Sequence, residues 1–283
     1  MKIGIIGLGL IGGTIAKTLN HNHTINAYDV KKEALMYALD NKIIHNAYYD
    51  LNTFLEDNNI IYLCLYPDMI IDFLKNNKVL IKNDSVLIEI SGIKSNLIKQ
   101  IDKLAITNFD IIYSHPIAGR ELIGVEHSDK RIFSKGNYAI VEHFGNKKQN
   151  IDLTIKLAKE MGFKNVSIIS AQIHDELIAY TSQLTHIISL ALVNSFQPKV
   201  NLSHFTGDSY RDLTRIANIN VPLWTDLFIN NKDLLCERIS DFQNQLETFK
   251  TAINLEDKTK LSKLMSQAKN LHNIYLKERN NED

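Results

Sequence analysis

One histidine of this sequence stands where a proton acceptor could be useful. His115 follows the apolar run Ile111–Tyr113, which we expect to be a buried strand, and Pro116 biases the backbone of His115 toward an extended conformation. Near neutral pH an imidazole can take a proton from an alcohol while a hydride leaves the adjacent carbon. A histidine at a strand end can equally be structural, so its role depends on what the fold places beside it.

Polar residues also interrupt an apolar helical pattern in the second half of the chain. Asp175, Ser182 and His186 are separated by seven and four residues, and we expect them on one side of a single helix. This helix should begin near Gln172. Alternatively, Ser182 hydrogen-bonds its own helix and His186 is a satisfied core residue.

Two arginines lie further along, four residues apart. The guanidinium of Arg211 or Arg215 offers a planar fork that suits a carboxylate, so one of them could hold an acidic substrate. Such a pair can also form an ordinary solvated face.

A glycine turn near the start of the chain supplies a second kind of chemistry. Gly7 permits a tight turn, Gly9 lets the backbone approach a pyrophosphate, and Gly12 lets the following helix pack against its strand. The free N–H groups of that helix would point at the phosphates. Asp29 ends the next apolar run at about the twenty-residue distance where a carboxylate meets the ribose hydroxyls of NAD. The predicted cofactor-binding residues are Gly7, Leu8, Gly9, Leu10, Ile11, Gly12 and Asp29.

The elements that must position these residues follow an alternating pattern before residue 166. The runs that we expect to be strands are Ile3–Ile6, Ile25–Tyr28, Ile60–Leu65, Val86–Ile90, Ile111–Tyr113 and Tyr138–Val141. Helical patterns separate them, as in a parallel sheet covered on both faces. After Val166 the pattern stays helical. We therefore predict an α/β chain: a doubly wound parallel sheet of Rossmann type (residues 1–166), followed by an all-helical domain for substrate binding and dimerisation (residues 167–283).

Composition excludes several classes of function. The 283 residues include 32 basic and 32 acidic side chains, with no long basic block, so we expect no nucleic-acid partner. We expect no window apolar enough for a membrane span, and no membrane partner. Only Cys64 and Cys236 are present, which favours a reducing cytoplasm and gives no support to a cysteine metal site; we predict no metal.

Several motifs in one order resemble the prephenate dehydrogenase family of tyrosine biosynthesis, which includes arogenate and cyclohexadienyl dehydrogenases. The resemblance covers the chain from Met1 to about Tyr275. The matching blocks are Gly7-Leu8-Gly9-Leu10-Ile11-Gly12-Gly13-Thr14, His115-Pro116-Ile117-Ala118-Gly119 with Glu121 and Gly124, His174-Asp175, Asp212-Leu213-Thr214-Arg215-Ile216-Ala217, and Trp224-Thr225-Asp226.

The resemblance implies roles for individual residues. His115 would accept the hydrogen bond of the substrate's ring hydroxyl, Arg215 would hold a carboxylate, and Glu121 would shape or gate the site. Ser91 would correspond to the serine that helps to orient the catalytic histidine. His186 would line the substrate pocket, as Ser182 would. Two departures stand out. The order Ser91-Gly92-Ile93-Lys94 displaces the serine by one place, and Gln183-Leu184-Thr185-His186 lacks the family's first histidine and its proline.

The expected activity is oxidative decarboxylation of prephenate to 4-hydroxyphenylpyruvate with hydride transfer to NAD, by a cytoplasmic homodimer. Arogenate dehydrogenase is the alternative. A β-hydroxyacid dehydrogenase or imine reductase of the same two-domain plan, and an NAD-binding sensor without turnover, also stay open. Asp29 predicts NAD over NADP because a carboxylate repels a 2′-phosphate. From the extent of the chain we further expect neither a fused chorismate mutase nor an ACT domain.

Overall fold

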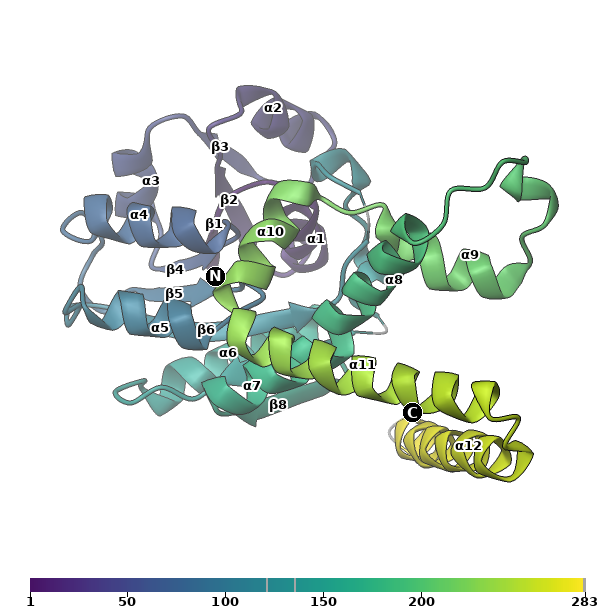
Figure 1. The fold of residues 1–283 in the computed structure, drawn as a ribbon. Helices are drawn as coiled ribbons and strands as arrows, with labels where there is room; N and C mark the ends of the chain where they lie inside the picture. Colours follow the sequence, from purple (N-terminus) through teal and green to yellow (C-terminus); the bar gives the residue numbers. More distant parts are fainter. Residues whose placement is uncertain (121, 135, 282–283) are drawn as a thin grey trace. The chain divides into compact units, whose positions relative to one another are not determined.

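Eight strands form one sheet in the computed structural model, which describes residues 1–120, 122–134 and 136–281 (Figure 1). Their order across the sheet is β3-β2-β1-β4-β5-β6-β7-β8. The strands are β1 (Lys2–Ile6), β2 (Thr24–Tyr28), β3 (Asn46–Tyr48), β4 (Ile60–Leu63), β5 (Val86–Glu89), β6 (Asp110–Ile117), β7 (Asn137–Val141) and β8 (Asn165–Ile169). The chain order reverses between β1 and β4, as in a doubly wound sheet.

The sheet is parallel except where β7 runs antiparallel to β6. This pairing extends β6 well beyond Tyr113, where the apolar run ends, because Ser114 to Ile117 pair with β7. His115 therefore lies inside a strand, opposite Ala139, and not just after one. The parallel sheet expected from the alternating pattern is confirmed for the other pairs, and the β6–β7 pair is the exception.

Helices cover both faces of the sheet and form two apolar cores. α1, α2 and α6 supply side chains to one core, whereas α3, α4 and α5 supply the other. Figure 1 shows α3, α4 and α5 side by side on their face. The bounds are α1 (Leu10–Leu19), α2 (Lys32–Asp40), α3 (Leu51–Asp57), α4 (Pro67–Asn77), α5 (Ser95–Asp102) and α6 (Lys148–Glu160), with 3₁₀ turns η1 (Val125–His127) and η2 (Lys130–Ile132).

Helices follow β8. They are α7 (Ala171–Ile178), α8 (Leu184–Asn194), α9 (Asp208–Thr214) and α10 (Val221–Asn230), with the short turns η4 (Leu202–His204) and η5 (Arg215–Ala217). Ser170 begins α7 by accepting a hydrogen bond from the N–H of Ile173, and Pro222 lies in the first turn of α10, where its missing N–H costs little. Between α7 and α8, the segment η3 (Ala179–Gln183) is a π-helical turn, so one helix runs from α7 to α8 with an irregular step in it.

This continuous helix corrects one expectation from the sequence. By length and composition Ala171–Asn194 could cross a membrane, with a mean hydropathy of 1.2, whereas no such window was expected. Within the fold, its Asp175 and Gln183 are buried and hydrogen-bond to α5 and α10. These contacts attach one side of the helix to the fold, and 28% of the apolar window is buried.

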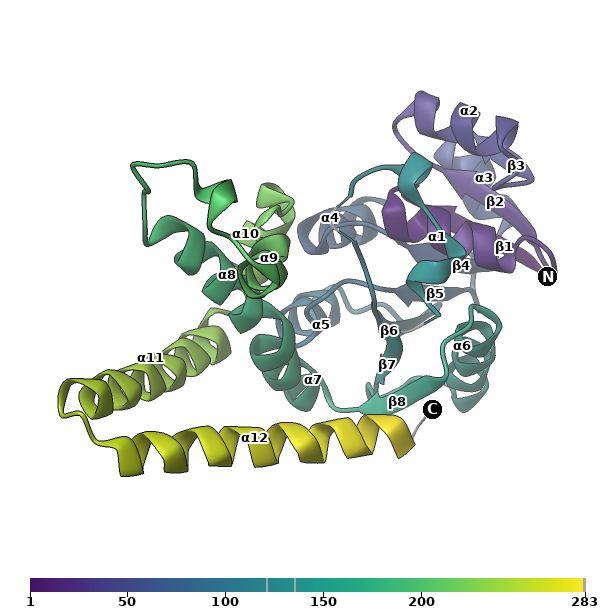
Figure 2. The same cartoon turned by 90° about the vertical axis from the view of Figure 1, so that its right-hand side faces the viewer.

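The chain divides into two compact units at Lys232. The second unit begins at Asp233 and contains the rest of α11 (Lys232–Asn254) and α12 (Lys258–Asn281), which Figure 2 shows as an antiparallel pair. Glu256 turns the chain between them with a φ of 52°. The predicted boundary between residues 166 and 167 falls inside β8, where we expected the helical pattern to begin; the boundary itself stays a prediction.

Candidate active site

The glycine turn between β1 and α1 has the shape of a nucleotide cradle. Gly7 has a φ of +94°, and a Cβ there would lie 2.4 Å from the carbonyl oxygen of Cys64. A Cβ on Gly12 would lie 2.1 Å from the carbonyl oxygen of Gly7, so both positions require glycine for packing. A Cβ on Gly9 would meet nothing within 4 Å. Gly9 is exposed and begins α1 without a side-chain cap, so the helix N-terminus is open to an anionic ligand.

Asp29 ties this turn to the end of β2. Its Oδ2 accepts a hydrogen bond from the N–H of Leu8 at 2.6 Å, and its Oδ1 accepts one from the N–H of Lys31 at 2.8 Å. A carboxylate has about four acceptor sites, so Asp29 retains capacity for ribose hydroxyls. Leu8 is buried, while Leu10 and Ile11 form the first residues of α1. The predicted cofactor residues thus lie together and fit a dinucleotide.

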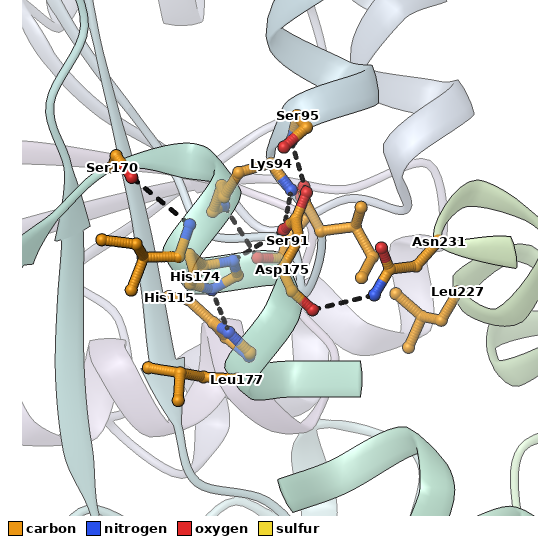
Figure 3. Close-up of polar contacts among 12 residues, drawn as sticks. Ser91, Lys94, Ser95, His115, Ser170, His174, Asp175, Leu177, Leu227 and Asn231 are labelled. Carbon is orange, nitrogen blue, oxygen red and sulfur yellow. Dashed lines mark hydrogen bonds and ion pairs between the residues drawn. The ribbon is translucent and has the colours of Figure 1, made fainter. Parts of the chain in front are cut away.

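His115 heads a row of hydrogen-bonded side chains that joins β6 to α7 (Figure 3). Its Nδ1 lies 3.0 Å from Nε2 of His174, and Nδ1 of His174 lies 2.8 Å from Oδ1 of Asp175. Asp175 in turn accepts hydrogen bonds from the backbone N–H groups of Lys94 at 2.9 Å and Ser95 at 2.7 Å, at the start of α5. His115 is half-buried, whereas His174 and Asp175 are each 1% exposed. The row thus runs from a partly accessible imidazole to a buried carboxylate.

A buried ion pair fixes the loop beside this row. The side chains of Glu89 and Lys94 are fully buried, with 2.5 Å between Oε2 and Nζ. Glu89 also accepts from the N–H of Ser91, and Lys94 Nζ donates to the Ser91 carbonyl at 2.8 Å. Burial lowers the pKa of Lys94, and Glu89 opposes that shift. Because each charge has a partner, the loop from Ser91 to Lys94 is held in one conformation.

That loop faces the second nitrogen of His115. A Cβ on Gly92 would lie 3.8 Å from His115 Nε2 and 3.2 Å from a methyl carbon of Leu227 in α10. Within the described residues, no protein group hydrogen-bonds to His115 Nε2. Gly92 therefore lies close to both His115 Nε2 and α10, and a bulkier residue at this position would collide with Leu227.

Burial governs the electrostatics of both histidines. It lowers the pKa of His115 well below its usual range, and the nearby His174 and Lys94 add to this effect. Burial also lowers the pKa of His174, although Asp175 partly opposes the shift. For Asp175, burial acts to raise the pKa, but hydrogen bonds from His174 and Ser95 outweigh it and leave a lowered pKa. At neutral pH both imidazoles are neutral and Asp175 is ionised.

Ser91 does not take the position that the family resemblance suggests. Its Oγ donates to the carbonyl of Ile93 at 3.1 Å, and the partner of His115 Nδ1 is His174. The one-place displacement in the sequence therefore coincides with a different orienting group in the structure. A catalytic role for Ser91 stays a prediction.

His186 lies on α8 and stacks on the indole of Trp224 in α10. The ring centroids are 3.7 Å apart, with 30° between the planes. The carbonyl of Ser182 can only accept, so Nδ1 of His186, 2.8 Å away, donates to it. Ser182 is half-buried within the π-helical turn. That turn interrupts the common face predicted for Asp175, Ser182 and His186: Asp175 contacts α5, whereas His186 contacts α10.

Arg215 begins η5, a short turn that packs against α8, and it is exposed. Arg211, one turn earlier, pairs with Asp208 of its own helix. The carboxylate-binding role of Arg215 stays a prediction. Glu121 lies outside the described residues. Among those that are described, no group of three or more His, Cys, Asp or Glu side chains could hold a metal ion.

Sequence reasoning missed the polar groups that hold His115. Glu89 sits at the end of an apolar strand with Lys94 five residues later, and this spacing of opposite charges around a loop was an available signal. His174 and Asp175 were noted as a motif, without a role. Asn231, whose Nδ2 donates to the Asp175 carbonyl at 3.0 Å and to Gln183 Oε1 at 2.8 Å, gave no signal.

Comparison with known proteins gives consistent results for both parts of the chain. Residues 14–167 match the family model of the prephenate dehydrogenase nucleotide-binding domain, and residues 170–267 match that of the prephenate dehydrogenase dimerization domain. Prephenate dehydrogenase of Bacillus subtilis is 23% identical over 94% of this chain and 73% of its own length.

Solved structures show the same fold. A prephenate dehydrogenase of Aquifex aeolicus, in complex with hydroxyphenyl propionate and NAD⁺, superposes with a TM-score of 0.87 at 24% identity and covers 98% of each chain. Synechocystis arogenate dehydrogenase superposes with a TM-score of 0.81 at 21% identity, covering 97% of this chain and 100% of its own.

Proposed function

Because the chain belongs to the prephenate dehydrogenase family, we propose that it catalyses the NAD-dependent oxidative decarboxylation of prephenate to 4-hydroxyphenylpyruvate in tyrosine biosynthesis. One observation carries the proposal: His115 is a neutral imidazole whose Nε2 has no hydrogen-bond partner among the described residues and lies near Gly92, close to the carboxyl ends of the parallel strands. In doubly wound sheets, ligands bind at that edge.

The fit of the glycine turn supports NAD as the cofactor. The open N-terminus of α1 and the space over Gly9 suit a pyrophosphate, and Asp29 suits the ribose hydroxyls. When bound, NAD supplies the acceptor for the hydride that leaves C4 of the substrate ring. Exposed Lys31 and Lys32 follow Asp29, so the preference for NAD over NADP rests on the carboxylate.

In this proposal His115 handles a proton while the bonds of the substrate change. Its Nε2 takes the proton of the C4 hydroxyl as the C4–H bond breaks, which leaves a carbonyl at C4. The bond from C1 to its carboxylate then breaks, carbon dioxide departs, and the electron pair makes the ring aromatic with the charge on the former carbonyl oxygen. That oxygen takes the proton back from His115. The protein therefore only has to align the reactants and hold one proton for a short time.

Arogenate is the alternative substrate, in which an amino group replaces the side-chain keto group and the ring chemistry is the same. The likeness to an arogenate dehydrogenase motivates it. Gln183, which stands where the family has its first histidine, is buried: its Nε2 donates to the Leu227 carbonyl at 2.9 Å, and its Oε1 accepts from Asn231. Gln183 is thus occupied between helices, which leaves His186 and Arg215 as the candidates for reading the substrate side chain.

The test is NADH formation from prephenate and arogenate, assayed side by side with the purified protein. A specific activity with prephenate at least tenfold above that with arogenate supports the proposal, and the reverse ratio assigns the alternative. If NAD stabilises the protein against thermal unfolding but neither substrate yields NADH, the protein is a nucleotide-binding sensor and the proposal fails.

We further propose a homodimer in the cytoplasm. The match to the dimerization domain supports the dimer. Exposed apolar residues on and between the helices after β8, such as Tyr180, Phe196 and Leu213, are consistent with a covered surface. Cys64 and Cys236 are both free, as expected in a reducing compartment. Sedimentation analysis of the purified protein tests the assembly.

A further inference from the structure

We propose that His174 and Asp175 are positioning residues that fix the tautomer of His115, with the proton on Nδ1 and none on Nε2. Only the last step of this inference, that Nε2 then receives a substrate proton, rests on the proposed function. The tautomer itself follows from the hydrogen-bond chemistry of the row in Figure 3.

The direction of each hydrogen bond is set at the carboxylate. Ionised Asp175 can only accept, so Nδ1 of His174 must carry a hydrogen and donate to it. A neutral imidazole has one donor and one acceptor nitrogen, so Nε2 of His174 is an acceptor. Nδ1 of His115, 3.0 Å away, must therefore be the donor, and Nε2 of His115 is left without a hydrogen.

Several hydrogen bonds stabilise the negative charge of Asp175, which sets the direction of the other hydrogen bonds in the row. Besides His174, the backbone N–H groups of Lys94 and Ser95 donate to the Asp175 carboxylate at the first turn of α5. Asn231 fixes the Asp175 backbone through its carbonyl. Hydrogen bonds to the charged form keep a buried carboxylate ionised. Asp175 thus remains a pure acceptor over the pH range in which His115 works.

The remaining charged groups near the row are Lys94 and Glu89. They neutralise each other across 2.5 Å and both lie on the β5 side of His115. The Lys94 ammonium disfavours a proton on either histidine, and Glu89 opposes it at His174. Both imidazoles therefore stay neutral when no substrate is present, and only neutral imidazoles leave His115 Nε2 without a hydrogen.

This arrangement also explains how His115 can gain a proton without moving. A proton arriving at Nε2 leaves the Nδ1–H bond to His174 in place, because Nδ1 is the donor before and after. The positive charge then lies two hydrogen bonds from Asp175. The displaced Ser91, whose Oγ is turned to Ile93, is not needed for this orientation.

The first experiment observes the tautomer directly, in the full-length protein labelled with ¹⁵N-histidine. The His115 resonances are assigned by their loss in His115→Asn. We expect Nδ1 to show the shift of a protonated nitrogen and Nε2 that of an unprotonated one at about pH 7.5. A hydrogen on Nε2 of His115 overturns the proposal.

The second experiment compares two substitutions at one position. In His174→Gln the amide oxygen can take the place of Nε2 and still accept from His115, whereas His174→Leu offers no acceptor. We expect His174→Gln to keep kcat within about fivefold and the Nδ1–H tautomer, and His174→Leu to lose roughly 10²-fold in kcat and show mixed tautomers. The KM for NAD should change less than about threefold in both. Equal kcat values for the two variants overturn the proposal.

A third variant acts one step further away. Asp175→Asn replaces an acceptor by a group that can also donate to His174, which reverses both hydrogen bonds; we expect a loss of kcat on the order of 10²-fold. If Asp175→Asn does not fold, the comparison of His174→Gln with His174→Leu still tests the proposal. The outcomes also separate this inference from the proposed function. If His115 shows the predicted tautomer but neither substrate yields NADH, the proposed function is rejected and the tautomer assignment stands. If His174→Leu turns over normally, the positioning role of His174 is rejected and the proposed function stands.

Discussion

The cofactor cradle and the His115 site are built in opposite ways. The turn of the cradle lies within a few consecutive residues, Gly7 to Gly12. It depends on glycines, because a side chain at Gly7 or Gly12 would collide with the backbone. The His115 site draws on β5, β6, α5 and α7 and depends on buried polar side chains that satisfy each other. A site made of backbone is encoded locally, whereas a site made of buried polar groups exists only once the fold has formed.

The two sites should also respond differently to substitution. An added side chain in the cradle either collides with backbone or takes ligand space, so its effects should appear in stability or in cofactor binding. A lost partner in the His115 site leaves a buried donor or acceptor unsatisfied and alters proton transfer, so its effects should appear in turnover. Four measurements test this contrast.

The largest effect is expected at the proton acceptor. His115→Asn should lower kcat by roughly 10² to 10⁴, the usual range for a lost general base, and leave the Kd of NAD nearly unchanged. Stopped-flow and steady-state NADH formation measure the first quantity, and calorimetric titration with NAD the second. Near-normal turnover would remove His115 from its role and with it the contrast between the two sites.

Arg215→Ala should have the next largest effect. Losing a charged hydrogen bond worth about 1.5–3 kcal/mol should raise the KM for the substrate roughly ten- to a hundredfold with less change in kcat. Arg211→Ala is the matched control, because Arg211 pairs with Asp208 on its own helix. If the KM responds to Arg211→Ala and not to Arg215→Ala, the carboxylate lies near the other arginine.

A pair of alanine substitutions tests the cradle itself. Gly9→Ala meets no protein atom within 4 Å and Gly9 has an ordinary φ of −86°, so the fold should tolerate it. The KM for NAD should still rise about tenfold, because the methyl group occupies ligand space. Gly12→Ala should instead lower the free energy of unfolding by about 1–3 kcal/mol or more. An unchanged KM in Gly9→Ala would mean that the phosphates bind elsewhere.

The smallest effect concerns acid stability. Burial lowers the pKa of His115 and of His174 in the folded state. Below about pH 6.5 these histidines therefore bind protons in the unfolded chain but stay unprotonated in the folded protein. Stability therefore falls as the pH falls from about 6.5 toward the depressed values. His174→Gln removes one of these groups, and its free energy of unfolding should decline less than that of the wild type between about pH 7 and about pH 5.5 in urea titrations. Parallel declines would show that His174 does not contribute.

The extent of successful prediction follows the same contrast. Strands with uninterrupted apolar runs, such as β4 and β5, were recognised because they are buried on both faces. β3 has only three residues, and β8 is an edge strand with exposed Ser167 and Ile168, so neither shows such a run. The amino-acid composition of β7 does not indicate its direction. Its antiparallel direction is evident only from its pairing with β6.

At the site, the spacing of Gly7, Gly9 and Gly12 predicted the cradle, since the turn itself is formed by consecutive residues. His115 was found by its place after a strand. Its partner was not, because His174 lies 59 residues away along the chain and the contact depends on where α7 begins relative to β6. The face shared by Asp175 and His186 was predicted from regular helical spacing, which the structure does not keep.

The π-helical turn Ala179–Gln183 affects how the helix from α7 to α8 responds to a change in its length. A π-helical turn takes up about one residue more than an α-helical turn, so deleting one residue there would restore regular winding and leave the faces beyond it nearly unchanged. His186 would then stay near Trp224, and His174 would keep its contact with His115. Deleting one residue of α8 before His186 would instead turn His186 by about 100° and detach it from Trp224, because a regular α-helix advances that angle per residue.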